Sequence, residues 1–381
     1  MRAVAAGVAV AALAAAALPG AAAAHPRLVA TTPAAGAELA TAPRRVVVQL
    51  TEAAAPVGDG IRVTGPDGSD ATRGPVVVAG GALTRSIAAR MQGTYVVEWL
   101  VVGDDTHPAR GSFLFSVGEP TEAVLPDHAD GGVVLEAAGH WLSLAGFALG
   151  FGVVFAALLS GGMTARLWRL VTVGVILMIV AEPVALLGQM ATLAPARVLE
   201  PAFAEDVLLT NYGHLAALRL GAAFGLWALT GALRQASPRS QWSIPFAGVA
   251  VAFVYAGSAH RIPAVPAPVS HLLVATHGVA FGAWLGCIVV AAAESRGAQL
   301  ARTAVTAALA LVVSGSALAL AHLEGPADLL ETAYGTTLGI KLALVALAFA
   351  LGAAARRRAE LAAALAVLAA ASLLVSLVPP A

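Results

Sequence analysis

The chain has 381 residues, of which 59% are hydrophobic and only 12% are charged. Its formal net charge is zero, so the charge balance does not favour a nucleic-acid partner. The apolar residues come in separate blocks long enough to cross a hydrocarbon core of about 30 Å, which takes about 20 residues. This composition excludes an ordinary soluble protein and predicts a protein embedded in a lipid bilayer.

Residues 1–24 have the features of a secretory signal peptide. Arg2 precedes an apolar run, and the small residues Ala22 and Ala24 form a typical cleavage motif. Cleavage after Ala24 would make His25 the mature amino terminus. The alternative is an uncleaved anchor, for which the apolar run is short.

Residues 25–118 predict an all-β sandwich or barrel. Short β-rich runs alternate there with Gly, Pro and Asp, a pattern typical of such folds. The runs are "RRVVVQL" (44–50), "GIRVTG" (60–65), "GPVVVAG" (74–80), "GTYVVEWLVV" (93–102) and "GSFLFSV" (111–117). An acidic, proline-containing linker, 119–132, follows and is expected at the membrane surface.

Residues 133–381 predict an all-α membrane domain of eight helices. The apolar blocks are 133–160, 167–193, 207–233, 244–259, 269–292, 303–322, 335–354 and 359–378. Nine arginines fall in the loops on one side: Arg166, Arg169, Arg234, Arg239, Arg296, Arg302, Arg356, Arg357 and Arg358. The loops on the other side carry only Arg197 and Arg261. Because basic loops stay in the cytoplasm, we expect a multi-pass plasma-membrane protein with an extracytoplasmic β domain.

The membrane domain contains an internal repeat. "TNYGHLAALRL" (210–220) opens the third expected helix and "TAYGTTLGIKL" (332–342) opens the seventh. Tyr212 and Arg219 are seven positions apart, as are Tyr334 and Lys341. Since the two helices differ by an even number of crossings, the pattern predicts two halves in parallel orientation.

Histidines dominate the candidate metal chemistry. The single cysteine, Cys287, allows neither an intrachain disulfide nor a thiolate cluster. After cleavage His25 would offer its α-amine and its ring nitrogen together, and "GDDTHP" (103–108) adds Asp105 and His107. Nitrogen and oxygen donors without sulfur suit Cu(II). The alternative is an Asp-containing turn and a frayed terminus.

Within the membrane domain, all the histidines lie toward the expected outer side. Three of them, His260, His277 and His322, are candidate copper or proton stations. The alternative for each is an interfacial cap. His277 and Trp284 are seven positions apart and share a helix face.

Glu182 is a carboxylate inside the second apolar block, which is a functional candidate by default. Met178 lies four residues earlier on the same face. Glu182 and Arg219 are expected at similar depth, so an ion pair with a structural role is the alternative. Arg219 and Lys341 would repel a bare cation, and we expect them to be orienting groups.

The β domain resembles the copper resistance protein CopC family. The resemblance rests on "HPRLVATTPAAGAELATAPRRVVVQLTEA" (25–53) and "GTYVVEWLVVGDDTHPARGSFLFSV" (93–117). It implies a Greek-key β domain that binds Cu(II) through His25, Asp105 and His107. Thr106 stands where the family usually has Gly.

The membrane domain resembles the CopD family, through "THGVAFGAWLGCIVV" (276–290) and "TAYGTTLGIKLAL" (332–344). A chain with both parts is similar to the CopC/CopD fusions implicated in copper uptake and homeostasis. Import as the direction of transport is implied by this resemblance alone.

The expected function is therefore that of a membrane copper protein and not of an enzyme. Its outer domain would capture Cu(II) and pass copper, as Cu(I) or Cu(II), to the membrane domain. Its partners would be the copper ion, the lipid bilayer and a copper chaperone on either side. No nucleotide-binding motif G-x-x-x-x-G-K-[ST] is present. The alternatives are copper sequestration, resistance or sensing without transport, and a haem-type membrane redox protein.

Overall fold

The computed structural model describes residues 26–103, 106–126, 131–257, 262, 265–323, 325–354, 356–377 and 379. The chain divides into two compact units. The sandwich unit comprises Ala21–Gly132 and Gln189–His214, and the helical unit comprises Val133–Gly188 and Leu215–Ala381. The predicted signal peptide lies outside the described residues.

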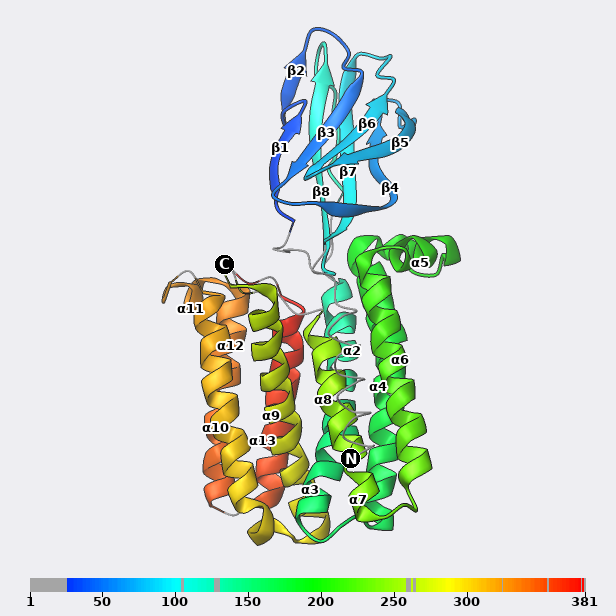
Figure 1. Ribbon diagram of the computed structural model, residues 1–381. Helices are drawn as coiled ribbons and strands as arrows, with labels where there is room; N and C mark the ends of the chain where they lie inside the picture. Colours follow the sequence, from blue (N-terminus) through cyan, green and yellow to red (C-terminus); the bar gives the residue numbers. More distant parts are fainter. Residues whose placement is uncertain are drawn as a thin grey trace. The chain divides into compact units, whose positions relative to one another are not determined.

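The sandwich unit contains two four-stranded sheets (Figure 1). The strands are β1 (Leu28–Thr32), β2 (Ala37–Leu39), β3 (Arg45–Leu50), β4 (Ala54–Thr64), β5 (Thr72–Ala79), β6 (Ala82–Ile87), β7 (Gly93–Gly103) and β8 (Pro108–Val117). One sheet has the order β1-β3-β6-β5 and the other β2-β8-β7-β4. The predicted all-β domain is confirmed, and of the two expected architectures it is the sandwich.

Alternation of apolar residues builds the core between the sheets. Along β3, Val46, Val48 and Leu50 are buried, and the residues between them are half-buried. The rings of Tyr95 and Phe115 stack with centroids 5.1 Å apart. The strands β1, β2 and β6 were missed by the sequence pattern, because β1 is largely exposed, β2 has three residues and only two residues of β6 are buried.

The helical unit follows from Gly131 onward. Its elements, with the connecting helices η2 and α5 of the sandwich unit, are α2 (Gly131–Phe147), the π-helix η1 (Ala148–Gly152), α3 (Val153–Leu159), α4 (Ala165–Leu193), η2 (Pro195–Arg197), α5 (Pro201–Leu208), α6 (Asn211–Leu233), α7 (Pro238–Gln241), α8 (Ser243–Ala256), α9 (Ala267–Glu294), α10 (Gly297–Ala321), α11 (Asp328–Glu331), α12 (Ala333–Ala353) and α13 (Arg357–Val375).

Seven of these helices are long and apolar enough to cross a membrane, among the described residues. They are Gly132–Leu159, which joins α2, η1 and α3, together with α4, α6, α9, α10, α12 and α13. The remaining predicted span, 244–259, corresponds to α8, which has 14 residues. At 1.5 Å per residue it reaches about 21 Å, short of the hydrocarbon core.

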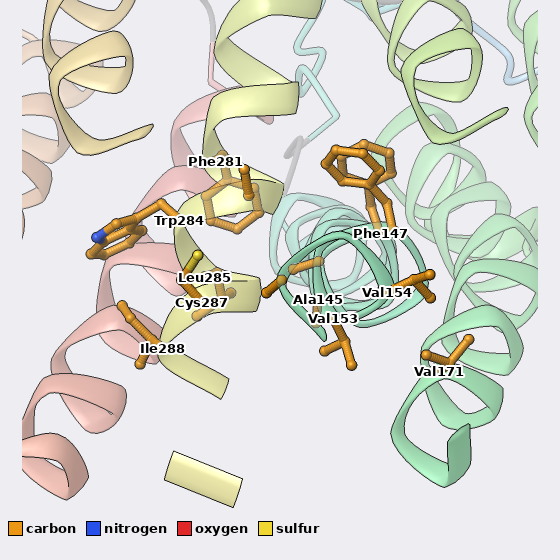
Figure 2. Packing of buried hydrophobic residues seen from close by; sticks show 14 of the residues in the cluster. Ala145, Phe147, Val153, Val154, Val171, Phe281, Trp284, Leu285, Cys287 and Ile288 are labelled. Carbon is orange, nitrogen blue, oxygen red and sulfur yellow. The ribbon is translucent and has the colours of Figure 1, made fainter. Parts of the chain in front are cut away.

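Close backbone contact joins η1 to α9. A Cβ atom at Gly152 would collide with the carbonyl of Gly282 and would lie 3.2 Å from Cα of Gly286. Glycines let helix backbones approach in this way. Phe147 and Val154 on one side and Phe281 and Leu285 on the other belong to the same apolar core (Figure 2).

The repeat is visible in the register of two helix pairs. Glu182 follows the first residue of α4 by 17 positions, and Ser314 follows the first residue of α10 by the same number. Arg219 in α6 and Lys341 in α12 each follow the helix start by eight positions. The second half therefore has serine at the position of the first half's carboxylate.

Candidate copper site and two polar centres of the helical unit

The turn between β7 and β8 holds His107. The Thr106 amide donates to the Gly103 carbonyl (3.0 Å), and the Gly103 amide donates to the His107 carbonyl (2.9 Å). Thr106 has φ of +73°, in the left-handed region that favours glycine. His107 is only 5% exposed. Asp105 lies outside the described residues.

The segment just after His25 attaches to the same end of the sandwich. The Arg27 amide donates to Oγ1 of Thr51 (3.0 Å), and the Thr51 amide donates to the Arg27 carbonyl (2.9 Å). Three residues later Ala54 pairs with Gly103 at the end of β7. Residues 51–54 thus hold both segments that carry the predicted copper ligands, although His25 itself lies outside the described residues.

Gln189 is a residue of this region that sequence reasoning missed. It belongs to the second segment of the sandwich unit, and its Nε2 donates to the Thr106 carbonyl (2.8 Å). Its side chain is completely buried. An amide within the apolar second block was the signal, because a buried polar group needs a hydrogen-bond partner.

The first polar centre of the helical unit is the ion pair between Glu182 and Arg219. Nε of Arg219 donates to both carboxylate oxygens at 3.0 and 3.1 Å, and its Nη2 lies 3.0 Å from Oε2. Both side chains are less than 10% exposed. Tyr255 of α8 lies near the pair and interacts with Ser143 of α2. The ion pair expected as the structural alternative is therefore present.

The second polar centre lies between α9 and α10. Nδ1 of His277 is 2.9 Å from Oγ of Ser314, whose hydroxyl donates to the Ala310 carbonyl at 2.6 Å. A Cβ atom at Gly315 would lie 3.0 Å from Cε1 of His277, so Ser314 and Gly315 together seat the ring.

The remaining predicted residues of the helical unit have packing or capping contacts. His322 donates from Nδ1 to the Leu318 carbonyl (2.8 Å), as expected for the cap alternative. Trp284 packs edge-on against Phe349, with centroids 5.7 Å apart. Met178 is fully buried in the apolar core. His260 lies outside the described residues.

One further histidine contact was not singled out from the sequence. Nδ1 of His140 in α2 lies 3.0 Å from Oγ of Ser376, the residue after α13. Among the described residues, no group of three His, Cys, Asp or Glu side chains is arranged to hold a metal ion.

Comparison with solved structures finds similarity to CopC and to PcoC. CopC from Methylosinus trichosporium OB3b is 24% identical, with 26% of this chain and 99% of that chain covered and a TM-score of 0.21. Two structures of the copper resistance protein PcoC from Escherichia coli are 23% and 27% identical, cover 24% and 25% of this chain and 99% of theirs, and have TM-scores of 0.20. No curated protein sequence matches the chain. In the family comparison, residues 28–118 match the CopC domain.

Proposed function

We propose that this chain is a membrane copper protein whose sandwich unit captures Cu(II) outside the cell and passes copper to the helical unit for import. Copper is its cargo, and the chain catalyses no covalent reaction. The convergence of the segment after His25 and the β7–β8 turn on residues 51–54 carries this proposal. The CopC match over residues 28–118 supports it.

The capture step follows from the chemistry of the donors. A mature amino terminus at His25 supplies an amine and an imidazole nitrogen, while Asp105 and His107 supply oxygen and nitrogen. This donor set suits Cu(II), because it offers nitrogen and oxygen ligands without sulfur. Backbone hydrogen bonds join Gly103 to Thr106 and to His107, so the backbone of His107 is attached to the end of β7.

The delivery step rests on the seven candidate spans and on the polar groups within them. Polar and ionisable residues inside a bilayer are costly and commonly line a cation or proton path. We place the histidines toward the extracytoplasmic side, as the arginine distribution of the loops predicts. A chaperone that delivers or accepts copper belongs to the same proposal.

The test compares copper binding with copper accumulation. Full-length protein in detergent should bind one Cu(II) in the sandwich unit, and His25→Ala or His107→Ala should weaken binding by at least about tenfold, the loss typical when a metal site is damaged. Cells that express the protein should accumulate more copper than cells without it. The exposed Arg44→Ala should change neither result.

The outcomes separate the alternatives. Cu(II) binding without any change in cell copper would replace import by sequestration or sensing. A Soret band in the purified protein would replace both by a haem protein. Unchanged affinity after His25→Ala, or equal affinity in the uncleaved form, would refute the amino-terminal ligand.

A further inference from the structure

The turn that carries His107 is attached to the carboxyl-terminal end of α4. Residues from Gln189 onward belong to the sandwich unit, and α4 ends at Leu193. Nε2 of Gln189 donates to the Thr106 carbonyl (2.8 Å), and Nη1 of Arg110 in β8 donates to the Leu193 carbonyl (3.4 Å). On α4 these two contacts are about one helical turn apart. The end of α4 therefore contacts the chain both before and after the predicted copper ligand.

Gln189 adds a side-chain hydrogen bond to a turn that the backbone already closes. The Thr106 amide donates to the Gly103 carbonyl, and the Gly103 amide donates to the His107 carbonyl. The Thr106 carbonyl belongs to the peptide group that continues into His107, and it accepts from Gln189. Because a peptide group is planar, a bond at this carbonyl also restrains the amide nitrogen of His107. Gln189 thus holds the backbone from which the imidazole extends.

The conformation of Thr106 gives this restraint a purpose. Its φ of +73° lies in the left-handed region, which is unfavourable for a residue with a branched Cβ. A strained backbone conformation persists only where surrounding contacts hold it in place. The bonds to Gly103 and Gln189 are such contacts. Loss of the Gln189 bond would let the turn relax and would move His107.

The burial of Gln189 favours a positioning role over a stabilising one. Its side chain is completely buried, and its Oε1 has no hydrogen-bond partner among the described residues. An amide oxygen that is buried without a partner costs about as much free energy as one hydrogen bond contributes. The side chain therefore adds little net stability. A role in holding the turn accounts for an amide at a position that an apolar residue would fill equally well.

We propose that Gln189 is a positioning residue for the copper ligand His107. Its amide holds the peptide group between Thr106 and His107, and so sets the place from which the imidazole reaches Cu(II). Gln189 acts through His107 and does not bind copper itself. The inference rests on the proposed Cu(II) site of the sandwich unit. It makes the affinity of that site depend on a residue outside 28–118, the part of the chain that matches the CopC domain.

The direct test measures the Cu(II) affinity of full-length protein in detergent by competition with a chelator. Gln189→Met keeps the length of the side chain and removes the donor. It should weaken Cu(II) binding about tenfold, the low end of the range for groups that hold a metal ligand by hydrogen bonding. Wild-type affinity in Gln189→Met would overturn the proposal.

Gln241→Met is the matched control. Gln241 is also buried, and its Nε2 donates to the carbonyls of Leu233 (3.3 Å) and Ala236 (3.2 Å) in the helical unit. Its replacement removes the same kind of contact far from His107 in the sequence, so Cu(II) affinity should stay at the wild-type value. Equal weakening by Gln189→Met and Gln241→Met would show a general loss of stability and would overturn the positioning role.

A double-mutant cycle tests whether Gln189 acts through His107. If it does, Gln189→Met should not weaken Cu(II) binding any further in a protein that already carries His107→Ala. A second tenfold loss in that background would overturn the proposal, because it would make Gln189 a ligand in its own right or a residue that acts elsewhere.

Hydrogen exchange examines the turn in the copper-free protein. The Thr106 amide is bonded to Gly103, and its exchange should be several-fold faster in Gln189→Met and unchanged in Gln241→Met. Unchanged exchange in Gln189→Met would contradict the restraint on the turn.

The measurements distinguish failure of the inference from failure of the proposed function. Cu(II) binding that is weakened by His107→Ala but not by Gln189→Met would overturn the inference and leave the copper site standing. Faster exchange in Gln189→Met together with no Cu(II) binding by the wild type would refute the copper site and leave Gln189 as the group that holds the turn.

Discussion

The two halves of the helical unit use the same helix register for different electrostatics. α4 and α6 place Glu182 against Arg219 in a buried ion pair, whereas α10 and α12 place Ser314 and Lys341 at the equivalent positions. A buried charge is tolerated when it is paired and hydrogen-bonded. The first centre is thus a neutralised ion pair, whereas the second half has a lysine for which the described residues supply no carboxylate.

The partner helices reinforce this difference. Tyr255 adds a hydroxyl group near the first pair. His277, seated on Ser314 and Gly315, adds a titratable ring to the second centre. An internal repeat therefore supplies two copies of one scaffold, of which the first contains an ion pair and the second a histidine in contact with a serine hydroxyl.

The largest expected effect comes from breaking the first pair. Arg219→Ala leaves Glu182 buried without its partner and should destabilise the protein by about 3–5 kcal/mol, whereas replacing both by Leu and Met should be nearly neutral. Lys341→Met should cost far less, because no described carboxylate depends on it. Denaturant unfolding in detergent measures all three. Equal losses for Arg219→Ala and Lys341→Met would remove the contrast between the halves.

The second-largest effect is expected at the contact between η1 and α9. Gly152→Ala forces a methyl group against the Gly282 carbonyl and should cost about 1–3 kcal/mol, the usual range for overpacking. Gly221 in α6 has open space around its Cβ position, so Gly221→Ala is the matched control. It should stabilise its helix by up to about 1 kcal/mol. Thermal unfolding in the same detergent compares the two, and a stable Gly152→Ala would contradict the close approach.

A smaller effect is expected at the second centre. Ser314→Ala removes the oxygen that accepts from His277 and should cost about 1 kcal/mol, as one hydrogen bond does. Ser314→Thr retains the oxygen and should recover most of this loss. The same unfolding assay decides, and equal stability of the alanine and threonine variants would show that the Ser314 hydroxyl does not hold the ring.

The smallest expected effect is on the pH dependence of unfolding of the sandwich unit. The Thr72 hydroxyl and amide hydrogen-bond to the Asp70 carboxylate and hold its pKa below the usual value. Because the folded pKa is lowered, the stabilisation is present above the unfolded pKa of about 3.9 and is lost as pH falls below it. Asp70→Asn should reduce the acid sensitivity of unfolding slightly. An unchanged acid profile would contradict the assignment.

Sequence reasoning was most accurate where a local pattern is sufficient. Alternating apolar residues predicted β3, β7 and β8, and long apolar blocks predicted the candidate spans, since burial imposes these periods on the chain. β1 and β2 were not predicted, because their positions depend on pairing with β3 and β8 rather than on their own burial. α8 was expected as a full span because apolar character alone does not fix where a helix ends.

At the candidate copper site, the residue types and spacing predicted Asp105 and His107 as ligands with His25. The shared attachment of their segments to residues 51–54 required the strand register, because sequence separation does not reveal which ends of a sandwich meet. Gln189 is 83 residues from Thr106, and only the fold brings them together. The ligand roles of His25, Asp105 and His107 remain predictions for the binding measurement.

The sequence by itself determined the two-part organisation, the repeat between α6 and α12, and the presence of Glu182, Arg219 and Lys341 within the apolar blocks. Tertiary structure decided how these charges are used. Glu182 is 37 residues from Arg219, and His277 is 37 residues from Ser314. Helix packing selects these partners, because in an apolar interior a polar group is stabilised by whichever complementary group the neighbouring helix presents.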